Sequence, residues 1–486
     1  MRAYQLTVGL EIHAELATET KLFCGCANRF GGAANTRVCP VCLGLPGVLP
    51  VLNRRAVELA VKAGLAFSCE ILLSSGFDRK NYFYPDLPKA YQITQFYHPL
   101  CRDGYLDVNG RRIGIERIHL EEDAGKLLHD PEAGRTYIDY NRCGVPLIEI
   151  VTRPDIHTPE EARDFVAAAA RRLRYAGVCD GRMEQGSLRC DVNLSVSLPG
   201  EPLGVRTELK NLSSLRAVSR AIEAEYRRQV AVLESGGQVV RETRRFDEAA
   251  GTTRSLRAKQ DAHDYRYFPE PDLPRIQLAP MEIHRLKDEL PEPPESRAER
   301  YVRWGIGGAE ANLLCEDRAL SDLYDQTVAV CPAYKAVASL ILTELLRCMK
   351  DAGKTVEALR FSPADLARLA ALQENGRVSK NGAREVLRRL YADGGDPEEI
   401  ARREGYLLAD DRDETREAVK SVLTDYPQAV EQYAAGESKV LGFLMGQIMR
   451  RLGRSANPVR VRETLTAVLE GEPEERVPND EKKGAE

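Results

Sequence analysis

Four cysteines near the start of the chain have the spacing of a metal site. Cys24 and Cys26 form a CxC pair, and Cys39 and Cys42 form a CxxC pair beyond a loop rich in glycine and asparagine. Two such pairs can supply the four thiolates of a closed tetrahedral Zn²⁺ site. A redox CxxC would open a helix, whereas the turn-like LGLPG follows Cys42, and a disulfide is unfavourable in a reducing compartment. We therefore predict one structural Zn²⁺, with metal-free thiols as the alternative.

A second set of reactive side chains lies on strand-like segments. LTVGLEIHA alternates so that Glu11 and His13 share its polar face, and IERIHLEED, LRCDVNLSVS and GVRTELK alternate in a similar way. A lone Glu-x-His is more often an ordinary solvated surface. If the four strands share one sheet, however, their carboxylates and imidazole converge, which suits Mg²⁺ carrying phosphates. These polar faces carry Glu11, His13, Glu121, Asp191, Asn193, Glu208 and Lys210.

The segment GFDRKNYFYPDLPKAYQITQ mixes cations with aromatic rings. Such a mixture can stack on a nucleotide base and hold its phosphates, although aromatic strands more often belong to a core. Proline and asparagine indicate that a loop interrupts the segment, and loops held by a scaffold often carry binding groups. The residues concerned are Arg79, Lys80, Tyr82, Phe83, Tyr84, Lys89 and Tyr91.

Strands with a few helices must position these side chains. Up to about Pro294 the alternating segments dominate, and helices interrupt them. One helix is predicted after Thr158, with Pro159 in its first turn, Glu161 completing a capping box and Gly177 ending it. Another is predicted in SSLRAVSRAIEAEYRRQVAVLESGG. This order fits an α+β domain better than a regular βαβ repeat.

The chain changes character around PEPPESRAER. Proline and charge mark a domain boundary there, and almost every later signal is helical. Ser362 is expected to cap one of these helices, with Pro363 after it and Gly376 ending it. We therefore predict an all-helical second part. Residues 476–486 are charged and contain proline, so we expect them to be disordered.

The composition limits the classes of function. The 486 residues suffice for two to four domains, and a net charge of −5 excludes nucleic-acid binding over the whole surface but not in local basic patches. No apolar run approaches the roughly 18–20 residues that cross a bilayer, and the start lacks a cleavable leader, so we expect a cytoplasmic protein with no membrane partner. The chain has neither a GxxxxGKS/T phosphate loop nor a GxSxG nucleophile. Any ATP must use another kind of site, and any amide hydrolysis another chain.

Seven longer motifs, in order along the chain, resemble one family. They are VGLEIHAEL, FDRKNYFYPDLPKAYQITQ, HLEEDAGK, DYNRCGVPLIEIVTRPDI, MEQGSLRCDVNLSV, ELKNLSS and DYRYFPEPDLP. The chain resembles the B subunits of the tRNA-dependent amidotransferases, the GatB family. GRVSKNGAREVL and GFLMGQIMRRLGRSANPVRVRETL extend the resemblance to the family's YqeY-like tail. The resemblance implies an antiparallel sheet domain, the cradle, over 1–294 with the zinc knuckle at 24–42, a helical domain over 295–405 and a YqeY-like helical tail over 406–475.

The resemblance also implies an activity and partners. Family members use ATP and Mg²⁺ to phosphorylate the side-chain carboxylate of Glu on tRNA(Gln) or of Asp on tRNA(Asn). Ammonia that the amidase, or A, subunit releases from glutamine then displaces phosphate, giving Gln-tRNA(Gln) or Asn-tRNA(Asn). A small C subunit ties the other two together. The lack of an amidase nucleophile in this chain agrees with that division, and the cognate non-discriminating synthetase is a further candidate partner.

Single residues follow from the matched motifs. The family's Mg²⁺ ligands correspond to Glu11, His13, Glu121 and Glu208, and alternation independently favours Glu121 over Glu122. Candidates to hold phosphate or the substrate carboxylate are Arg79, Lys80 and Lys210, and the first two are predicted to bind the cofactor. The predicted catalytic residues, which would hold the carboxylate, assist the ion or orient ammonia, are Asp191, Asn193 and Lys210. In the tail, contacts with tRNA phosphates are implied for Arg450, Arg451, Arg454, Arg460 and Arg462, with a solvated helix face as the alternative.

Two rival functions stay open at this point. A zinc-stabilised tRNA-binding scaffold without catalysis would leave the acidic strand faces merely solvated. A free-standing ligase of small carboxylates would turn over ATP without tRNA or partner chains. Some members of the family lack the four cysteines, so zinc would brace a loop and take no part in the chemistry.

Overall fold

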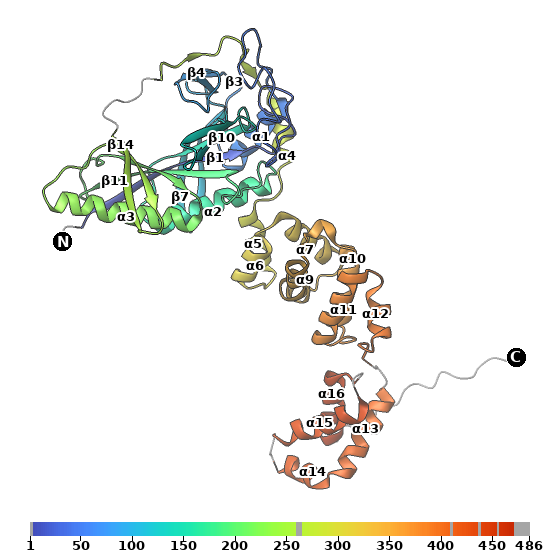
Figure 1. The fold of residues 1–486 in the computed structure, drawn as a ribbon. Coiled ribbons are helices and arrows are strands. Elements are labelled where there is room, and N and C mark those ends of the chain that lie inside the picture. The colour runs from blue at the N-terminus through green and yellow to red at the C-terminus, as the bar shows by residue number, and fades with distance from the viewer. Residues whose placement is uncertain (1–2, 259–264, 409–411, 436–438, 454–455, 471–486) are drawn as a thin grey trace. The chain divides into compact units, whose positions relative to one another are not determined.

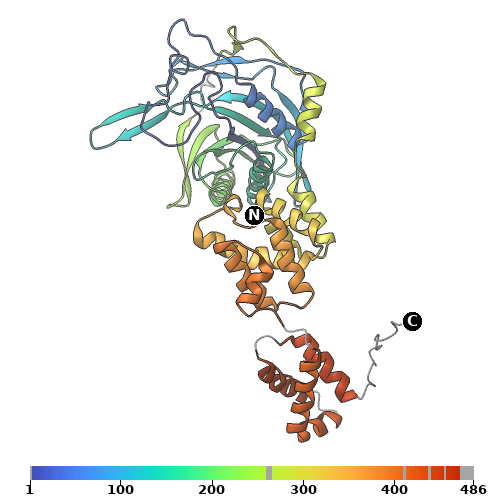
Figure 2. The same ribbon diagram turned by 90° about the vertical axis from the view of Figure 1, so that its right-hand side faces the viewer.

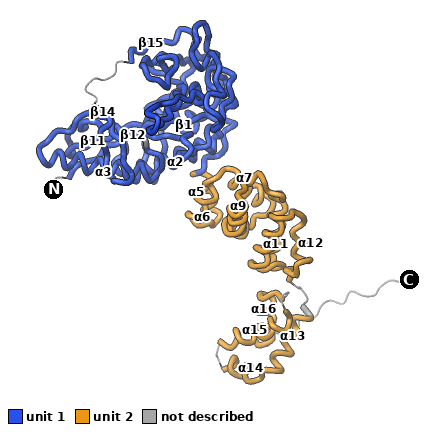
Figure 3. The backbone as a smooth tube through the Cα atoms, in the orientation of Figure 1, with its two compact units in different colours: residues 1–294 blue, residues 295–486 orange. Residues whose placement is uncertain are grey.

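The chain forms two compact units, residues 1–294 and 295–486 (Figure 3). The computed structural model describes residues 3–258, 265–408, 412–435, 439–453 and 456–470. Arg454 and the C-terminal end predicted to be disordered lie outside these residues. Among the described residues, no helix combines the length and the apolar character needed to span a bilayer.

A nine-stranded sheet organises the first unit (Figure 1). Its spatial order is β14-β13-β12-β11-β1-β10-β7-β6-β2. Every neighbouring pair is antiparallel except β12 and β13, which are parallel. The prediction of an antiparallel sheet is therefore wrong for this one pair, because a helix connects the two strands and returns the chain to the same end. The strands are β1 (Gln5–Glu15), β2 (Glu70–Ile71), β6 (Cys101–Val108), β7 (Arg111–Glu122), β10 (Pro146–Thr152), β11 (Leu188–Ser197), β12 (Thr207–Leu212), β13 (Glu242–Asp247) and β14 (Thr252–Ala258).

One face of this sheet is apolar and lies in the core. The alternation predicted for β1 is confirmed, since Val8, Leu10 and Ile12 are at most 1% exposed. Helices α1 (Arg54–Ala66), α2 (Pro159–Tyr175) and α3 (Leu215–Glu234) contribute to the same core. The predicted capping box of α2 is also confirmed, because the Thr158 side chain accepts from the backbone N–H of Glu161.

Smaller elements border the sheet and bring in the aromatic segment. β4 (Asp78–Asn81) and β5 (Tyr91–Thr94) pair with each other, and β15 (Phe268–Pro269) joins β4. The loop predicted inside this segment lies between β4 and β5. The Leu120 N–H of β7 donates to Oε1 of Gln95 at 3.0 Å, so the small sheet lies against the large one. The remaining elements of this unit are β3 (Ser74–Ser75), β8 (Lys126–Asp130), β9 (Arg135–Asp139), β16 (Ile276–Gln277) and α4 (Pro280–Asp288).

The second unit is helical over its described residues, as predicted (Figure 2). One hydrophobic core runs from Ala298 to Ala401 and a separate one from Ala418 to Leu465. The predicted cap is confirmed at the start of α10, where the Ser362 side chain accepts from the backbone N–H of Asp365. The division of this unit into 295–405 and 406–475 stays a prediction. Its helices are α5 (Pro294–Arg303), α6 (Gly308–Leu314), α7 (Arg318–Val330), α8 (Tyr334–Ser339), a π-helix (Leu340–Leu345), α9 (Leu346–Ala352), a 3₁₀ helix (Val356–Ala358), α10 (Pro363–Glu374), α11 (Lys380–Asp393), α12 (Pro397–Arg403), α13 (Arg412–Asp425), α14 (Pro427–Ala434), α15 (Val440–Leu452) and α16 (Pro458–Glu470).

Candidate functional site

The polar face of the large sheet carries charged side chains in register across its central strands. Arg189 of β11 faces His13 of β1, which faces Glu149 of β10, which in turn faces His119 of β7. In the next row Glu11 faces Asp191. The strands whose polar faces were expected to converge therefore share one sheet, and their polar side chains stand within reach of one another.

His13, Glu121 and Glu149 form the first group of potential metal ligands. The Nε2 atom of His13 lies 3.4 Å from Glu121 Oε1 and 3.4 Å from Glu149 Oε2. His119 completes the surroundings, with its Nε2 atom 3.5 Å from Glu149 Oε2. One ligand atom from each of the three residues lies within 4.8 Å of the others, so the donor set fits a divalent cation.

The charges in this group depend on one another. Burial disfavours the charged imidazole of His13, but its hydrogen bond to Glu149 and the nearby carboxylates outweigh burial and raise its pKa to about 9. Burial likewise works against the Glu149 carboxylate, but His119 and His13 hold its pKa well below the usual value. Without a metal ion, a protonated imidazole supplies the positive charge between the two carboxylates, and a metal ion that bound His13 would displace this proton.

Glu11, Asp191 and Glu208 form a second group beside the first. One carboxylate oxygen of each lies within 4.8 Å of the others. Lys210 contacts two of them, with its Nζ atom 2.9 Å from Asp191 Oδ2 and 3.0 Å from Glu208 Oε1. Asn193 donates to Glu11 Oε1 at 2.8 Å. Burial and the neighbouring Glu149 raise the pKa of Glu11.

The expected Mg²⁺ ligands are thus divided between these two groups. His13 and Glu121 belong to the first, while Glu11 and Glu208 belong to the second. The ligand atoms of the four residues therefore do not all lie close enough together to bind one ion. The sequence could not reveal this division, because the register between neighbouring strands determines it. Alternation was right about the orientation of the acidic pair on β7, since Glu121 faces His13 whereas Glu122 forms a buried ion pair with Lys89.

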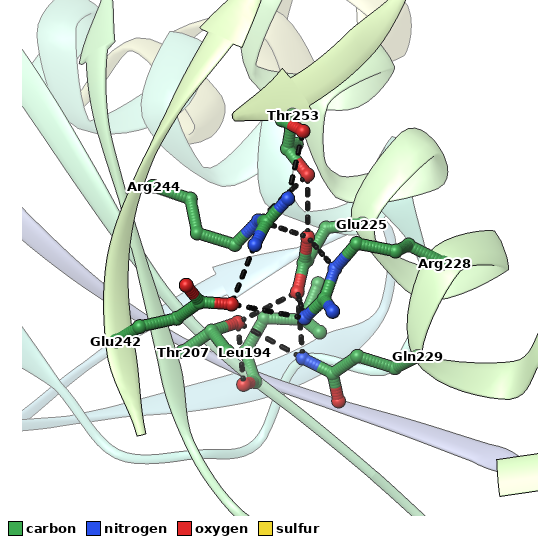
Figure 4. A network of polar contacts seen from close by, with 8 residues as sticks. All are labelled: Leu194, Thr207, Glu225, Arg228, Gln229, Glu242, Arg244 and Thr253. Carbon is green, nitrogen blue, oxygen red and sulfur yellow. Dashed lines mark hydrogen bonds and ion pairs between the residues drawn. The ribbon is translucent and has the colours of Figure 1, made fainter. Parts of the chain in front are cut away.

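A buried polar network supports the strand that carries Glu208 (Figure 4). The carboxylate of Glu225 on α3 accepts from Thr207 of β12 at 3.0 Å and from Thr253 of β14 at 2.7 Å. Arg244 of β13 lies 3.2 Å from the same carboxylate. The Glu225 side chain of α3 thereby contacts three strands, β12, β13 and β14, which include both strands of the parallel pair. The network also includes Leu194, Arg228, Gln229 and Glu242.

The two predicted phosphate-binding cations differ in their surroundings. Arg79 is already held by two carboxylates, at 2.7 Å from Glu270 and 2.9 Å from Asp272. Lys80 contacts rings, with its Nζ atom 4.9 Å from the Tyr265 ring centroid, and its charge helps to lower the pKa of Glu149. The charge of Lys80 therefore acts on the first group, whereas Arg79 is held in an ion-pair network.

Sequence reasoning missed Glu149, and it gave no role to His119 or Arg189. A signal for Glu149 was present, since it is the one charged residue in the otherwise apolar run PLIEIV. A charge is costly at such a position unless it has a partner. No comparable signal lies near Arg189 in the sequence, because its position at the site depends on the pairing of β11 with β1.

The four cysteines meet as predicted. One sulfur atom from each of Cys24, Cys26, Cys39 and Cys42 lies within 4.8 Å of the others, an arrangement consistent with a metal site. The Cys24 thiol, the backbone N–H of Cys39 and the ammonium of Lys21 together lower the pKa of Cys42 to about 4. The site therefore already favours one thiolate, the form that binds metal.

Comparison with known proteins agrees with this geometry. Residues 6–284 match the family profile described as the GatB/GatE catalytic domain, and residues 322–469 match the one described as the GatB domain. The chain is 47% identical over 472 residues to the B subunit of the aspartyl/glutamyl-tRNA(Asn/Gln) amidotransferase of Thermodesulfovibrio yellowstonii, covering 96% of this chain and 99% of that protein. It is 48% identical over 476 residues to the B subunit from Caldicellulosiruptor saccharolyticus, with the same coverage.

Both profiles and both relatives therefore point the same way, over nearly the whole length of the chain. Two groups of potential metal ligands lie within the segment that matches the catalytic-domain profile. The chain belongs to the GatB family, the B subunits of the tRNA-dependent amidotransferases.

Proposed function

We propose that this protein is the ATP-dependent subunit of a glutamyl/aspartyl-tRNA amidotransferase. It phosphorylates the side-chain carboxylate of Glu-tRNA(Gln), Asp-tRNA(Asn) or both, and then amidates that carboxylate with ammonia from the amidase partner. The observation that carries the proposal is the polar sheet face, where two groups of potential metal ligands adjoin each other inside the segment matching the catalytic-domain profile. A non-catalytic scaffold would have no need of such groups.

The charge of each residue on the polar face indicates its role in this function. The donor sets suit Mg²⁺, which when bound would neutralise phosphate charge and polarise the phosphoryl group. His13, Glu121 and Glu149 would hold one cation, and Glu11, Asp191 and Glu208 would hold another or orient ammonia. Lys80 would bind phosphate oxygens. Lys210 and Asn193 keep the carboxylates of the second group in position.

The four cysteines support a structural role for zinc. Four thiolates close the tetrahedral shell and leave no position for substrate. The loop between the two cysteine pairs is held against β9, because the Asn35 amide donates to the backbone carbonyl of Ile138 at 2.9 Å. Zinc would therefore brace this loop and take no part in the reaction.

The proposed function includes partners. The protein would work in the cytoplasm within a complex of three chains, alongside the amidase, or A, subunit and the small C subunit. The aminoacyl-tRNA would be the substrate, and the non-discriminating synthetase is a further candidate partner. The exposed Arg450 and Arg451 of α15 are candidates for tRNA phosphate contacts, although Arg451 also pairs with Asp425 at 2.7 Å.

Two variants test the site in the purified three-chain complex. His13→Ala and Glu11→Ala should abolish conversion of Glu-tRNA(Gln) and Asp-tRNA(Asn), while tRNA binding and glutamine hydrolysis by the amidase partner persist. Arg112→Gln, an exposed arginine of β7 paired with Asp107, serves as the matched control. Full amidation by either alanine variant would refute the assignment and favour the scaffold.

A further inference from the structure

Arg189 is a cation beside the first group of metal ligands that the proposed function leaves without a task. It lies on β11, directly opposite His13, at the end of the row that continues through Glu149. Its side chain is 34% exposed, so its guanidinium reaches solvent at the polar face. A substrate bound to this face could therefore contact the Arg189 side chain.

The hydrogen bonds of Arg189 leave most of its donors unused. Its Nη2 atom donates to Asp123 Oδ2 at 2.8 Å. Among the described residues, its Nε and Nη1 atoms have no hydrogen-bond partner. A guanidinium carries five N–H donors in a planar fork that matches an oxyanion. Arg189 can thus keep its bond to Asp123 and still bind a ligand.

Asp123 does not require Arg189 as its only partner. Arg142 lies 3.3 Å from the same Asp123 oxygen, and the backbone N–H of Ala124 donates to the other at 2.9 Å. Asp123 would therefore keep a cation if Arg189 turned to a ligand. In that respect Arg189 differs from Arg79 and Lys210, each of which is shared by two carboxylates.

Lys80 is a second cation whose charge reaches the same group. It comes from β4 of the small sheet, and its charge acts on Glu149. Cations from two different sheets thus act on the group formed by His13, Glu121 and Glu149. An oxyanion held at this group would be attracted by both cations, as a phosphoryl transfer site requires.

We propose that Arg189 binds the oxyanion of the substrate that reacts at the group formed by His13, Glu121 and Glu149. The ligand is a triphosphate oxygen of the nucleotide or the side-chain carboxylate of the aminoacyl-tRNA, both of which offer paired oxygens to the guanidinium. The inference rests on the proposed function. It adds a substrate-binding residue to that site.

The test uses the purified three-chain complex with Arg189→Gln and Arg189→Lys. Two quantities are measured: calorimetric affinity for the non-hydrolysable ATP analogue AMPPNP with Mg²⁺, and KM for Glu-tRNA(Gln). Loss of a charge-assisted bidentate contact should weaken one of them roughly ten- to a hundredfold, with Lys restoring part of it. Weaker AMPPNP binding identifies phosphate as the ligand, whereas a raised KM with unchanged AMPPNP binding identifies the carboxylate.

Arg102→Gln is the matched control, because Arg102 is an exposed arginine of the same sheet that pairs with Glu70 at 2.9 Å. A purely structural role is examined with the double variant Asp123→Asn, Arg189→Gln, which removes both charges of the pair. Wild-type values for Arg189→Gln, or their recovery in the double variant, would overturn the inference. Should Arg189→Gln fail to fold, Arg189→Lys decides the matter, since it keeps the charge beside Asp123.

The two proposals fail in different ways. If His13→Ala retains amidation, the proposed function of the face is wrong. If His13→Ala is inactive while Arg189→Gln behaves like Arg102→Gln, the face is catalytic and only the role of Arg189 is wrong.

Discussion

At the scale of single residues, Glu149 is the acid on which the first group of ligands depends. Its carboxylate lies 3.4 Å from His13 and 3.5 Å from His119, so it fixes two imidazoles at once. Glu149→Gln keeps the shape of the side chain but removes its charge. We expect amidation to fall at least a hundredfold and binding of Mn²⁺, followed by electron paramagnetic resonance, to weaken. Glu116→Gln, an exposed position of β7, should have no effect on either quantity.

Lys21 is a buried cation beside the four cysteines of the zinc knuckle. Its side chain has no exposed surface, and Nζ lies 2.9 Å from the Arg37 carbonyl oxygen and 3.7 Å from Cys42 Sγ. Four thiolates around one divalent ion leave a net negative charge, which this ammonium offsets. Lys21→Met should therefore release zinc to a chromogenic chelator several times faster than the wild-type protein. An unchanged release rate, equal to that of the exposed control Lys126→Met, would contradict this.

At the scale of elements, the network around Glu225 joins α3 to three strands. Glu225→Gln removes one of the two carboxylates that pair with the buried Arg244 and the half-buried Arg228, and leaves them Glu242. Breaking a buried ion pair completely costs about 3–5 kcal/mol, so we expect a loss of up to that size. We expect a clear fall in the urea concentration at which the first unit unfolds. Glu223→Gln on the same helix removes only an exposed ion pair with Arg227, and should change the stability by less than about 1 kcal/mol.

The same network predicts a dependence on pH. Burial would raise the pKa of Glu225, but the hydrogen bonds from Arg228, Gln229 and Thr253 prevail and lower it. A lowered folded-state pKa stabilises the protein above the unfolded value of about 4.3 and loses that contribution as pH falls through the folded value. The stability difference between wild type and Glu225→Gln should therefore shrink on acidification below about pH 4. A difference that stays constant on acidification from neutral pH through this range would exclude the linkage.

The sequence predicted these elements better than it predicted their contacts. Alternation placed Glu11 and His13 on one face, and capping residues located α2 and α10, because both signals act within a few residues. The division of the ligands into two groups depends on how strands far apart in sequence align. Arg79 shows the same limit, since its partner Glu270 is 191 residues away and nothing near Arg79 in the sequence indicates it.

At the scale of the whole molecule, the first unit has everything needed to fold alone. Among the described residues, its core draws only on those between Tyr4 and Leu290. A fragment of residues 1–294 should therefore melt in one cooperative transition, followed by circular dichroism, and should bind AMPPNP with Mg²⁺ as the full chain does. A fragment that stays unfolded would show that the second unit contributes to the stability of the first.

The position of β1 has a consequence for how the protein is made. This strand is synthesised before the other strands of the sheet, yet it lies between β10 and β11, which end at Thr152 and Ser197. At roughly 5–20 residues per second, β1 waits on the order of ten seconds or more before its second neighbour exists. Until β10 is made the strand has neither neighbour, and until β11 is made the edge that carries Val8, Leu10 and Ile12 stays open on one side. Nascent chains stalled before Ser197 should accordingly be the ones that chaperones bind most strongly.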